Sequence, residues 1–398
     1  MVSGTRRHVV MCLAVVTVVL AFGLTSACGG GASTSVSKPA RATTKPGPGQ
    51  PVLTRAEQTF QRGTIAMYQR TLAEMVRKRQ FVAGVWHPAE PCWRCGTEIG
   101  TVAAMLARET GSKAYLSEAI ATFDTTLARH RDPNGSFGPP VTGDHFSTEA
   151  EVVTMGTAYL ELRALLPSRL RAEWKTDVGA AAEQVEPNLR FYVNGNVNLQ
   201  ETLAMYVAWL VTRNSRYLTD YNGSWAFTLD PGPSWPGYGL QYTRVPTKRF
   251  GSNGSGYLAE QAGTGAPGYD PHYTLLQQDY AAELYALSRQ ARVLRLLNLL
   301  FNQVRPGIDP HTMSISYGPG SSHPTGSVAL FASPSLPVLA FANRPDLRWL
   351  VPRQLKRLTL DFTAYAKTDN FQDQPIGNYV AALVDLDPLE QGSGNRPR

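Results

Sequence analysis

The feature that most constrains the fold of this chain is a repeated pair of helices. In each pair an apolar helical run ends at a short polar turn, and a second helical run begins within a few residues. This pattern is typical of an αα-hairpin with a tight joint. It recurs at residues 106–116, 162–170, 209–218, 285–294 and 340–350.

The spacing of these pairs predicts how they assemble. Successive joints lie roughly 50 to 75 residues apart, so none of the short solenoid repeat periods fits. Long connections separate one pair from the next. We therefore predict an all-α fold in which the pairs close into an (α/α) toroid, either incomplete or a six-hairpin barrel, with long loops on one face. The alternative is an open α-solenoid.

The N-terminus predicts export. Arg6 and Arg7 precede an apolar run at residues 9–24, which is followed by small residues and Cys28. This order describes a secretory signal. It also resembles a bacterial lipobox, which implies a diacylglycerol on Cys28, although Thr25 stands where that motif prefers Leu. The arginine pair weakly resembles a twin-arginine signal, so Sec and Tat export both stay open.

These features divide the chain into four parts. Residues 1–27 are predicted to be a signal peptide, and residues 28–52, rich in Gly, Ser, Thr and Pro, a lipidated flexible tether. Residues 53–390 form the predicted helical domain, and residues 391–398 a disordered tail. We expect the domain to lie outside the cytoplasm, anchored to the outer face of the cell membrane as a lipoprotein. The alternative is an uncleaved membrane anchor.

Charge and metal-ligand spacing limit the partners. The net charge of +7 is a mild basic excess, which suits an acidic polymer or an anionic surface. The basic residues are too few and too scattered to indicate nucleic-acid binding, and no binding motif for it is visible. Histidines and acids show no metal-ligand spacing, so we expect neither a metal nor a cofactor.

Two cysteines remain after Cys28, namely Cys92 and Cys95. In an oxidising compartment they are predicted to form a short disulfide loop. A thioredoxin-like motif would follow a strand, whereas these surroundings look helical. A zinc site lacks ligands, because His87 is the only further candidate nearby.

Residues 252–280 hold the densest set of chemically useful side chains. The first half is so rich in Gly and small polar residues that we expect no regular element there; a helix then begins at His272. Catalytic groups often lie on such loops. The alternative is that Asp270 and His272 cap the helix and Asn253 forms a turn. The candidate catalytic residues are Glu260, Tyr269, Asp270, His272 and Tyr273.

Polar residues also precede the other helices that would line the ring. If the ring closes, these entry points meet on one face and form a cup, the usual form of a ligand site. About half of them are expected to be helix caps only. Aromatic residues at 223–251 suit stacking on sugar rings, or they attach the loop to the ring. The candidate substrate-binding residues are His145, Glu149, Asn196, Asn198, Trp235, Arg249, Asn253 and His323.

Three segments carry a resemblance to a known family: residues 194–198, residues 253–261, and Gly268-Tyr269 with Tyr273. Together they resemble the helical domain of chondroitin and hyaluronate type polysaccharide lyases, which are (α/α) toroid carbohydrate-active enzymes. The resemblance covers roughly residues 54–390 and implies action on a polysaccharide. The family's histidine base is replaced by Ala262, which leaves proton abstraction to His272, His145 or a tyrosine.

The residue types leave three functions open. β-Elimination beside a uronate requires amide donors that neutralise the carboxylate, a base for the α-proton and an acid for the leaving oxygen. Hydrolysis requires two carboxyl groups beside the glycosidic bond. The fold does not decide between them. The third function is that of a non-catalytic glycan-binding or cell-envelope scaffold lipoprotein. Carboxyl candidates for hydrolysis are Glu98, Asp144, Glu149, Glu260 and Asp270.

Overall fold

The computed structural model describes most of the predicted helical domain. The chain divides into two units, Met1–Lys45 and Pro46–Arg398, and every described residue belongs to the second. Cys28, Cys92, His323 and the predicted signal, tether and tail lie outside the described residues, as do the side chains of Cys95 and His145. Description covers residues 54–368, except 78–80, 83–84, 87–92, 139–144, 191–192, 262–265, 317–326 and 330–332.

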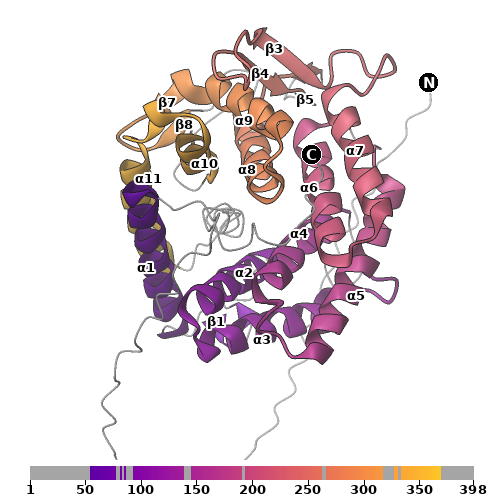
Figure 1. The fold of residues 1–398 in the computed structure, drawn as a ribbon, viewed down its shortest axis with the longest axis vertical. Coiled ribbons are helices and arrows are strands. Elements are labelled where there is room, and N and C mark those ends of the chain that lie inside the picture. Colours follow the sequence, from indigo (N-terminus) through magenta and orange to yellow (C-terminus); the bar gives the residue numbers. More distant parts are fainter. Residues whose placement is uncertain are drawn as a thin grey trace, which may run out of the picture. The chain divides into compact units, whose positions relative to one another are not determined.

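Helices make up the framework of this unit (Figure 1). None of the described helices is long and apolar enough to cross a membrane. The helices are α1 (Arg55–Arg77), α2 (Trp93–Thr110), α3 (Lys113–His130), α4 (His145–Leu162), α5 (Ser168–Val185), α6 (Gly195–Thr212), α7 (Ser215–Leu229), α8 (Pro271–Ser288), α9 (Ala291–Val304), α10 (Ser335–Ala342) and α11 (Val351–Thr368).

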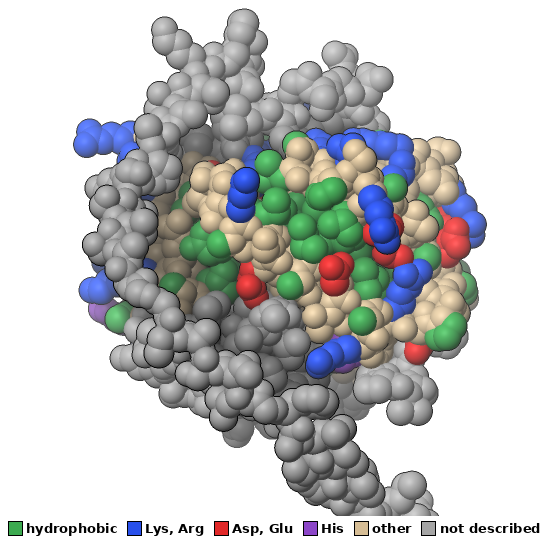
Figure 2. Space-filling view, turned by 90° about the horizontal axis from the view of Figure 1, so that it is seen from below, with side chains coloured by type: hydrophobic (Ala, Val, Ile, Leu, Met, Phe, Trp, Pro, Cys, Tyr) green, Lys and Arg blue, Asp and Glu red, His purple; other side chains and the backbone are tan. Residues whose placement is uncertain are grey.

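The helices form an inner and an outer layer. Helices α2, α4, α6, α8 and α10 contact one another in that order, and α3, α5, α7 and α9 each pack behind the inner helix that precedes them. Inner α6 is buried on every side from Glu201 to Trp209, which suits a helix enclosed by neighbours. Outer α7 buries only one face, and the outer helices α3 and α5 present charged side chains of both signs around apolar atoms (Figure 2).

The five predicted hairpin joints are confirmed, and three of them share one local chemistry. Gly111, Arg213 and Arg289 adopt left-handed φ angles of 68°, 62° and 55°. The Thr or Ser before each of them accepts a hydrogen bond from the backbone N–H after it, at 3.1–3.3 Å. The guanidinium groups of Arg213 and Arg289 lie over Trp209 and Tyr285, four residues earlier. These contacts stabilise a conformation that non-glycine residues seldom adopt.

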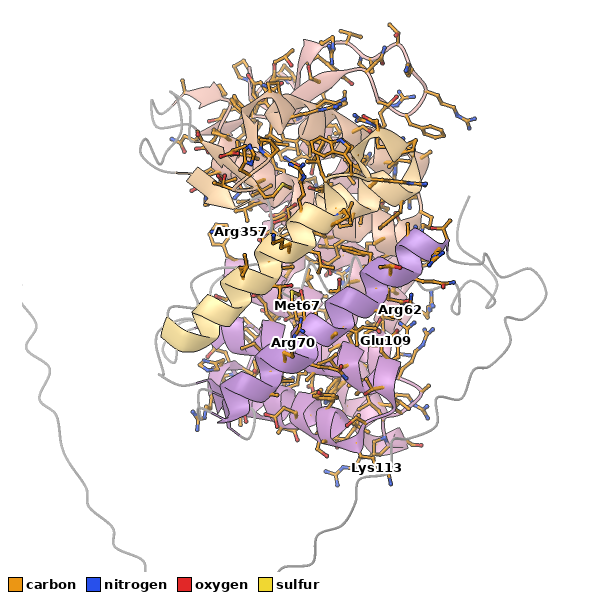
Figure 3. The ribbon with its side chains drawn as sticks, turned by 90° about the vertical axis from the view of Figure 1, so that its left-hand side faces the viewer. Arg62, Met67, Arg70, Glu109, Lys113 and Arg357 are labelled. Atoms are coloured by element: carbon orange, nitrogen blue, oxygen red, sulfur yellow. The ribbon has the colours of Figure 1, made fainter. Side chains whose placement is uncertain are left out.

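The first and last described helices close the ring. Helices α1 and α11 lie side by side (Figure 3). A Cβ atom on Gly63 would lie 2.7 Å from Leu355 Cδ2, so glycine permits this close approach. The Phe60 ring is also 5.7 Å from Phe341 of α10. The predicted all-α toroid is therefore confirmed, and the open solenoid is excluded.

Short antiparallel strands occupy the connections from outer to inner helices. Their presence between α7 and α8 corrects the expectation that the first half of residues 252–280 holds no regular element. Strand β4 forms there because β3 supplies its hydrogen-bond partners, with Leu240 opposite Leu258. The strands are β1 (Phe81–Val82), β2 (Val85–Trp86), β3 (Leu240–Arg244), β4 (Ser255–Leu258), β5 (Glu260–Gln261), β6 (Pro267–Gly268), β7 (Ile308–Asp309), β8 (Ser314–Ser316) and β9 (Ser327–Ala329).

Candidate functional site

The connection between α7 and α8 folds back onto the N-terminal end of α6. Gly195, the first residue of α6, donates its N–H to the Ala259 carbonyl at 3.2 Å. A Cβ atom on Gly195 would overlap with Leu258 Cβ, so only glycine lets β4 lie this close. The backbone contact brings Glu260, the next residue of the connection, to the start of an inner helix.

The Glu260 carboxyl joins three elements. It is fully buried, and its Oε1 accepts hydrogen bonds from the Asn196 N–H at 2.7 Å and from Gln277 Nε2 at 2.6 Å. Gln277, on α8, also exchanges hydrogen bonds with the backbone N–H and carbonyl of Leu258. The arrangement fixes β5 against the N-terminal parts of α6 and α8. It also satisfies a backbone N–H in the first turn of α6, which has no partner within the helix.

Burial sets the protonation state of Glu260. It raises the pKa of this carboxyl to about 8, against the opposing effect of the two donated hydrogen bonds. The nearby charge of Asp270 raises the pKa further. The second oxygen, Oε2, is buried and has no hydrogen-bond partner in the structure as described. Glu260 therefore holds its proton at neutral pH.

Asp270 is the N-cap of α8, which is the capping alternative raised from the sequence. Its Oδ1 accepts hydrogen bonds from the backbone N–H groups of His272 at 2.9 Å and Tyr273 at 3.3 Å. Capping does not remove the carboxyl from the site, because its charge acts on Glu260. The side chains of His272 and Tyr273 are half-buried, and their ring centroids lie 5.4 Å apart with the two rings nearly perpendicular.

Tyr269 stands beside this cap and keeps its proton. Its ring packs against Tyr257 with a centroid distance of 5.3 Å. Burial, followed by the charge of Asp270, raises the pKa of Tyr269 to about 12. At neutral pH the phenol is therefore a hydrogen-bond donor and a poor base.

The asparagines at the start of α6 lie at the same end. Asn198 is buried, and Asn196 is bonded to Glu260 through its backbone. The Oδ1 atoms of both side chains are buried without a hydrogen-bond partner among the groups described. Buried polar atoms normally have a partner, so these two amide oxygens are candidates to receive a ligand or water. The structure thus brings the start of α6 together with Glu260, whereas substrate binding by the two asparagines stays a prediction.

Other predicted binding residues lie elsewhere. Asn253 is the turn residue of the alternative interpretation, because its Oδ1 accepts from the backbone N–H groups of Thr247 and Lys248. Trp235 is exposed and contacts Tyr238 edge-on. Arg249 lines a pocket whose lining includes neither Glu260 nor Asp270.

The structure gives little information on the side chains of the remaining predicted site residues. Glu149 is buried on α4. His145 is the first residue of the same helix, but its side chain is not described. His323 and the proposed disulfide partner Cys92 fall in gaps of the description. Their proposed roles stay predictions.

The sequence interpretation missed a deeper set of buried carboxyls. Glu283 on α8 accepts a hydrogen bond from Thr157 Oγ1 on α4 at 3.2 Å, and burial raises its pKa to about 8. Thr157 and Glu283 are each the thirteenth residue of an 18-residue inner helix. Helix α6 lies between these two helices, α4 and α8, in the ring. Burial also raises the pKa of Glu151 to about 8 and that of Asp279 well above its usual range. The sequence did contain a signal for these buried carboxyls, because each is an acidic residue within a helix predicted to line the ring.

The described residues contain no group of three or more His, Cys, Asp or Glu side chains suited to a metal ion. Nothing in the described site therefore identifies a metal-binding position.

Comparison with known proteins identifies the fold. No protein-family model matches the chain, and no curated protein matches it in sequence. The structure is similar to that of D-mannose isomerase, with a TM-score of 0.51 and 12% identity over 84% of this chain and 99% of that chain. It is also similar to a family 76 glycoside hydrolase from a bovine Bacteroides thetaiotaomicron strain, with a TM-score of 0.43 and 11% identity over 81% of this chain and 77% of that chain.

The first of these similarities supports the (α/α) toroid and, at 12% identity, carries no residue roles. Neither of the two is a polysaccharide lyase. The resemblance to chondroitin and hyaluronate lyases therefore stays a prediction.

Proposed function

We propose that this chain is an extracytoplasmic lipoprotein that hydrolyses a polysaccharide, with Glu260 as the general acid. D-mannose isomerase, whose fold the chain shares, acts on a sugar according to its name. The proposal includes the lipid anchor at Cys28, the Cys92–Cys95 disulfide and a cup formed by the inter-hairpin loops. It keeps the sequence interpretation of a toroid that acts on a carbohydrate, and of the two reactions left open there, elimination and hydrolysis, it adopts hydrolysis.

The observation that carries the proposal is the protonated Glu260 carboxyl beside Asp270. Hydrolysis of a glycosidic bond requires one carboxylic acid that protonates the leaving oxygen and a second carboxylate that activates water or attacks the sugar. Glu260, with a pKa of about 8, holds the required proton at neutral pH. Asp270 sits at the N-terminus of α8, where the helix dipole favours a negative charge. Two carboxyls in contrasting environments are the usual basis of such a division of roles.

The neighbouring residues fit the remaining tasks. In this proposal the Glu260 proton leaves from Oε2, the oxygen that lacks a described partner. The amides of Asn196 and Asn198 bind sugar hydroxyl or carboxylate groups. Tyr269, which keeps its proton up to about pH 12, donates a hydrogen bond to the substrate.

A second candidate, a non-catalytic glycan-binding protein, is favoured by one observation. Glu260 is fully buried, and its bonds to Asn196 and Gln277 hold the connection on α6 and α8. A purely structural carboxyl would show the same bonds. In that case the cup would bind a glycan without cleaving it.

Turnover assays separate these functions. The purified protein is incubated with neutral and uronate-containing polysaccharides, and new reducing ends are measured together with the ultraviolet absorbance of unsaturated uronate. Hydrolysis produces reducing ends without that absorbance, whereas elimination produces both. Binding without either product supports the non-catalytic candidate. The Glu260→Gln variant keeps the hydrogen-bond acceptor but loses the acid, so it is expected to stay folded and inactive.

A further inference from the structure

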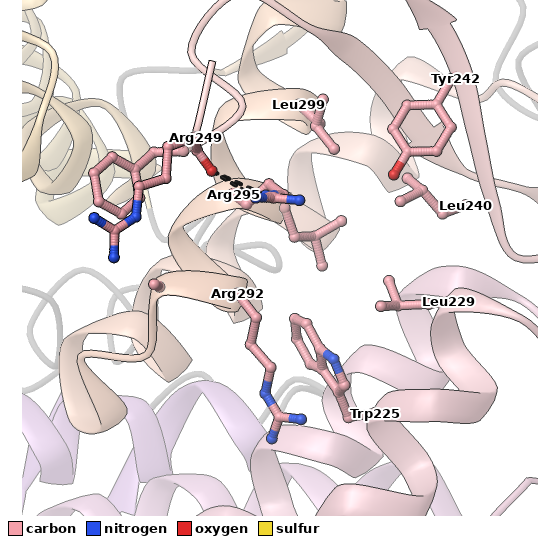
Figure 4. A pocket seen from close by; sticks show the side chains of 11 residues that line it. Trp225, Leu229, Leu240, Tyr242, Arg249, Arg292, Arg295 and Leu299 are labelled. Carbon is pink, nitrogen blue, oxygen red and sulfur yellow. Dashed lines mark hydrogen bonds between the residues drawn. The ribbon is translucent and has the colours of Figure 1, made fainter. Parts of the chain in front are cut away.

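A pocket of about 420 Å³ lies on the outer side of the ring, away from the residues of the proposed catalytic centre. It is bounded by α7, by α9 and by strand β3 with the loop that follows (Figure 4). Its volume falls within the range of small-molecule sites. Four leucines supply much of its apolar surface: Leu229, Leu240, Leu296 and Leu299.

Three arginines share this lining, and no acidic residue does. None of Arg249, Arg292 and Arg295 forms an ion pair with a described carboxylate. All three are exposed, so their positive charge is available at the surface of the pocket.

Neutral hydrogen-bond acceptors hold two of these arginines in place. Arg295 donates from Nε and Nη2 to the backbone carbonyl of Arg249, at 3.1 and 2.7 Å. Arg292 donates to Gln290 Oε1 at 2.7 Å and to Asn222 Oδ1 at 2.8 Å, and its guanidinium lies 5.0 Å from the Trp225 ring centroid. Neutral partners position a guanidinium without cancelling its charge, which is the arrangement expected of an anion-binding group.

The corresponding groove between α3 and α5 has the opposite charge. It is about 350 Å³ in volume and is lined by Asp124, Glu173 and Asp177, together with Trp174. Arg131, which is not part of that lining, pairs with Asp177. A lining of unpaired arginines is therefore a property of the α7–α9 pocket and not of outer grooves in general.

We propose that the α7–α9 pocket binds an anionic amphiphile, a phosphate-bearing lipid whose acyl chain lies over the leucines and whose phosphate meets the guanidiniums. A sugar ring fits poorly, because its hydroxyl groups would face leucines that cannot bond to them. A free anion would leave the apolar surface uncovered. Planar guanidinium forks match phosphate oxygens, and an acyl chain gains free energy by leaving water. This binding is independent of the proposed hydrolysis.

Calorimetric titration with a short-chain lipid tests the proposal. Dihexanoyl phosphatidic acid, kept below its micelle concentration, is expected to bind saturably near one molecule per chain. Inorganic phosphate and dihexanoyl phosphatidylcholine, at the same concentrations, are expected to show no saturation. Each ligand lacks one of the two required features, the first the acyl chains and the second the net negative charge.

Two variants and a matched control locate the site. Ala291→Trp places an indole in the pocket from an exposed position at the start of α9 and is expected to abolish binding. Arg249→Gln removes a guanidinium but keeps the carbonyl that Arg295 uses, and is expected to weaken binding about tenfold. Lys248→Gln, which removes an exposed charge outside the lining, is expected to leave binding unchanged.

Several results would overturn the proposal. Undiminished binding to the Ala291→Trp variant would place the lipid elsewhere. Saturable binding of inorganic phosphate as tight as that of the lipid would indicate an anion site without an acyl chain. An equal loss in the Arg249→Gln and Lys248→Gln variants would indicate general charge attraction.

Discussion

Two regions of the toroid each hold a buried glutamic acid with a pKa of about 8, yet their surroundings differ. Glu260 comes from an inter-hairpin connection and is bonded by a backbone N–H of α6 and by Gln277, next to the charge of Asp270. Glu283 lies well inside α8 and is bonded by Thr157 of a helix that is not its neighbour. A raised pKa therefore does not by itself identify a catalytic group. The distinguishing feature of Glu260 is its position at the N-termini of two inner helices, because Glu283 also has a second carboxyl nearby, that of Asp279.

The largest expected effect is on turnover. Glu260→Gln should lower the rate of polysaccharide hydrolysis by about 10²- to 10⁴-fold, because it removes the proton donor while keeping an acceptor for Asn196 and Gln277. Glu283→Gln is the matched change in the deeper region and should leave the rate within about twofold. Initial rates of reducing-end release measure both. An equal loss of hydrolysis rate in the two variants would contradict the assignment of catalysis to Glu260 alone.

Stability should depend on pH in both regions. The folded pKa of Glu151, Glu260 and Glu283 is about 8, against an ordinary value of 4.5, so between these limits the folded state binds more protons than the unfolded state. The stabilisation is complete below about pH 4.5 and is lost as the pH rises through 8. The melting temperature should therefore fall from pH 5 to pH 8, and less steeply in the Glu283→Gln variant. A melting temperature that rises over this interval would contradict the assignment.

Removing the bond across the ring should reduce stability without reducing turnover. Thr157→Val replaces the hydroxyl that donates to Glu283 by a group of similar shape and leaves a buried acid without that donor. The free energy of unfolding should fall by about 1–3 kcal/mol in chemical denaturation. Thr219→Val, at an exposed position on α7, is the control and should change little. Loss of turnover in folded Thr157→Val protein would show that the deeper region contributes to the chemistry.

The smallest expected effect concerns the interaction between the two carboxyls of the proposed site. Asp270→Asn keeps a good N-cap residue but removes a charge that raises the pKa of Glu260. The pKa of Glu260 should therefore decrease, though burial keeps it well above 4.5. Infrared titration of the protonated carboxyl band, assigned by its loss in Glu260→Gln, measures this directly. An unchanged titration would show that Asp270 does not act on Glu260.

Local chemistry explains which parts of the fold were predictable. The joints at Gly111, Arg213 and Arg289 are encoded within a few residues. Strand β4 was missed because its partner β3 lies outside the glycine-rich segment that contains it. Hydrogen bonds supplied from another part of the chain override a weak local preference.

The sequence predicted those parts of the candidate site that lie in one segment, residues 252–280. Glu260 and Asp270 are ten residues apart in the sequence, whereas Asn196, which is 64 residues from Glu260, is bonded to it only in the folded ring. Glu283 was not recognised because its partner Thr157 is 126 residues away and only the register of the inner helices brings them together. Asn253 differs, because its partners Thr247 and Lys248 lie in its own loop and the turn was already the alternative raised from the sequence.

The contact between α1 and α11 has a consequence for how the protein forms. The surface of α1 that includes Phe60 and Gly63 is covered by Phe341 and Leu355, which are made nearly 300 residues later. An incomplete chain emerging from the ribosome would carry that apolar surface uncovered until α10 and α11 have been made. Ring closure is thus a long-range event that favours slow folding and a need for chaperones. A C-terminal truncation within α11 should expose the first helix as well as shorten the last.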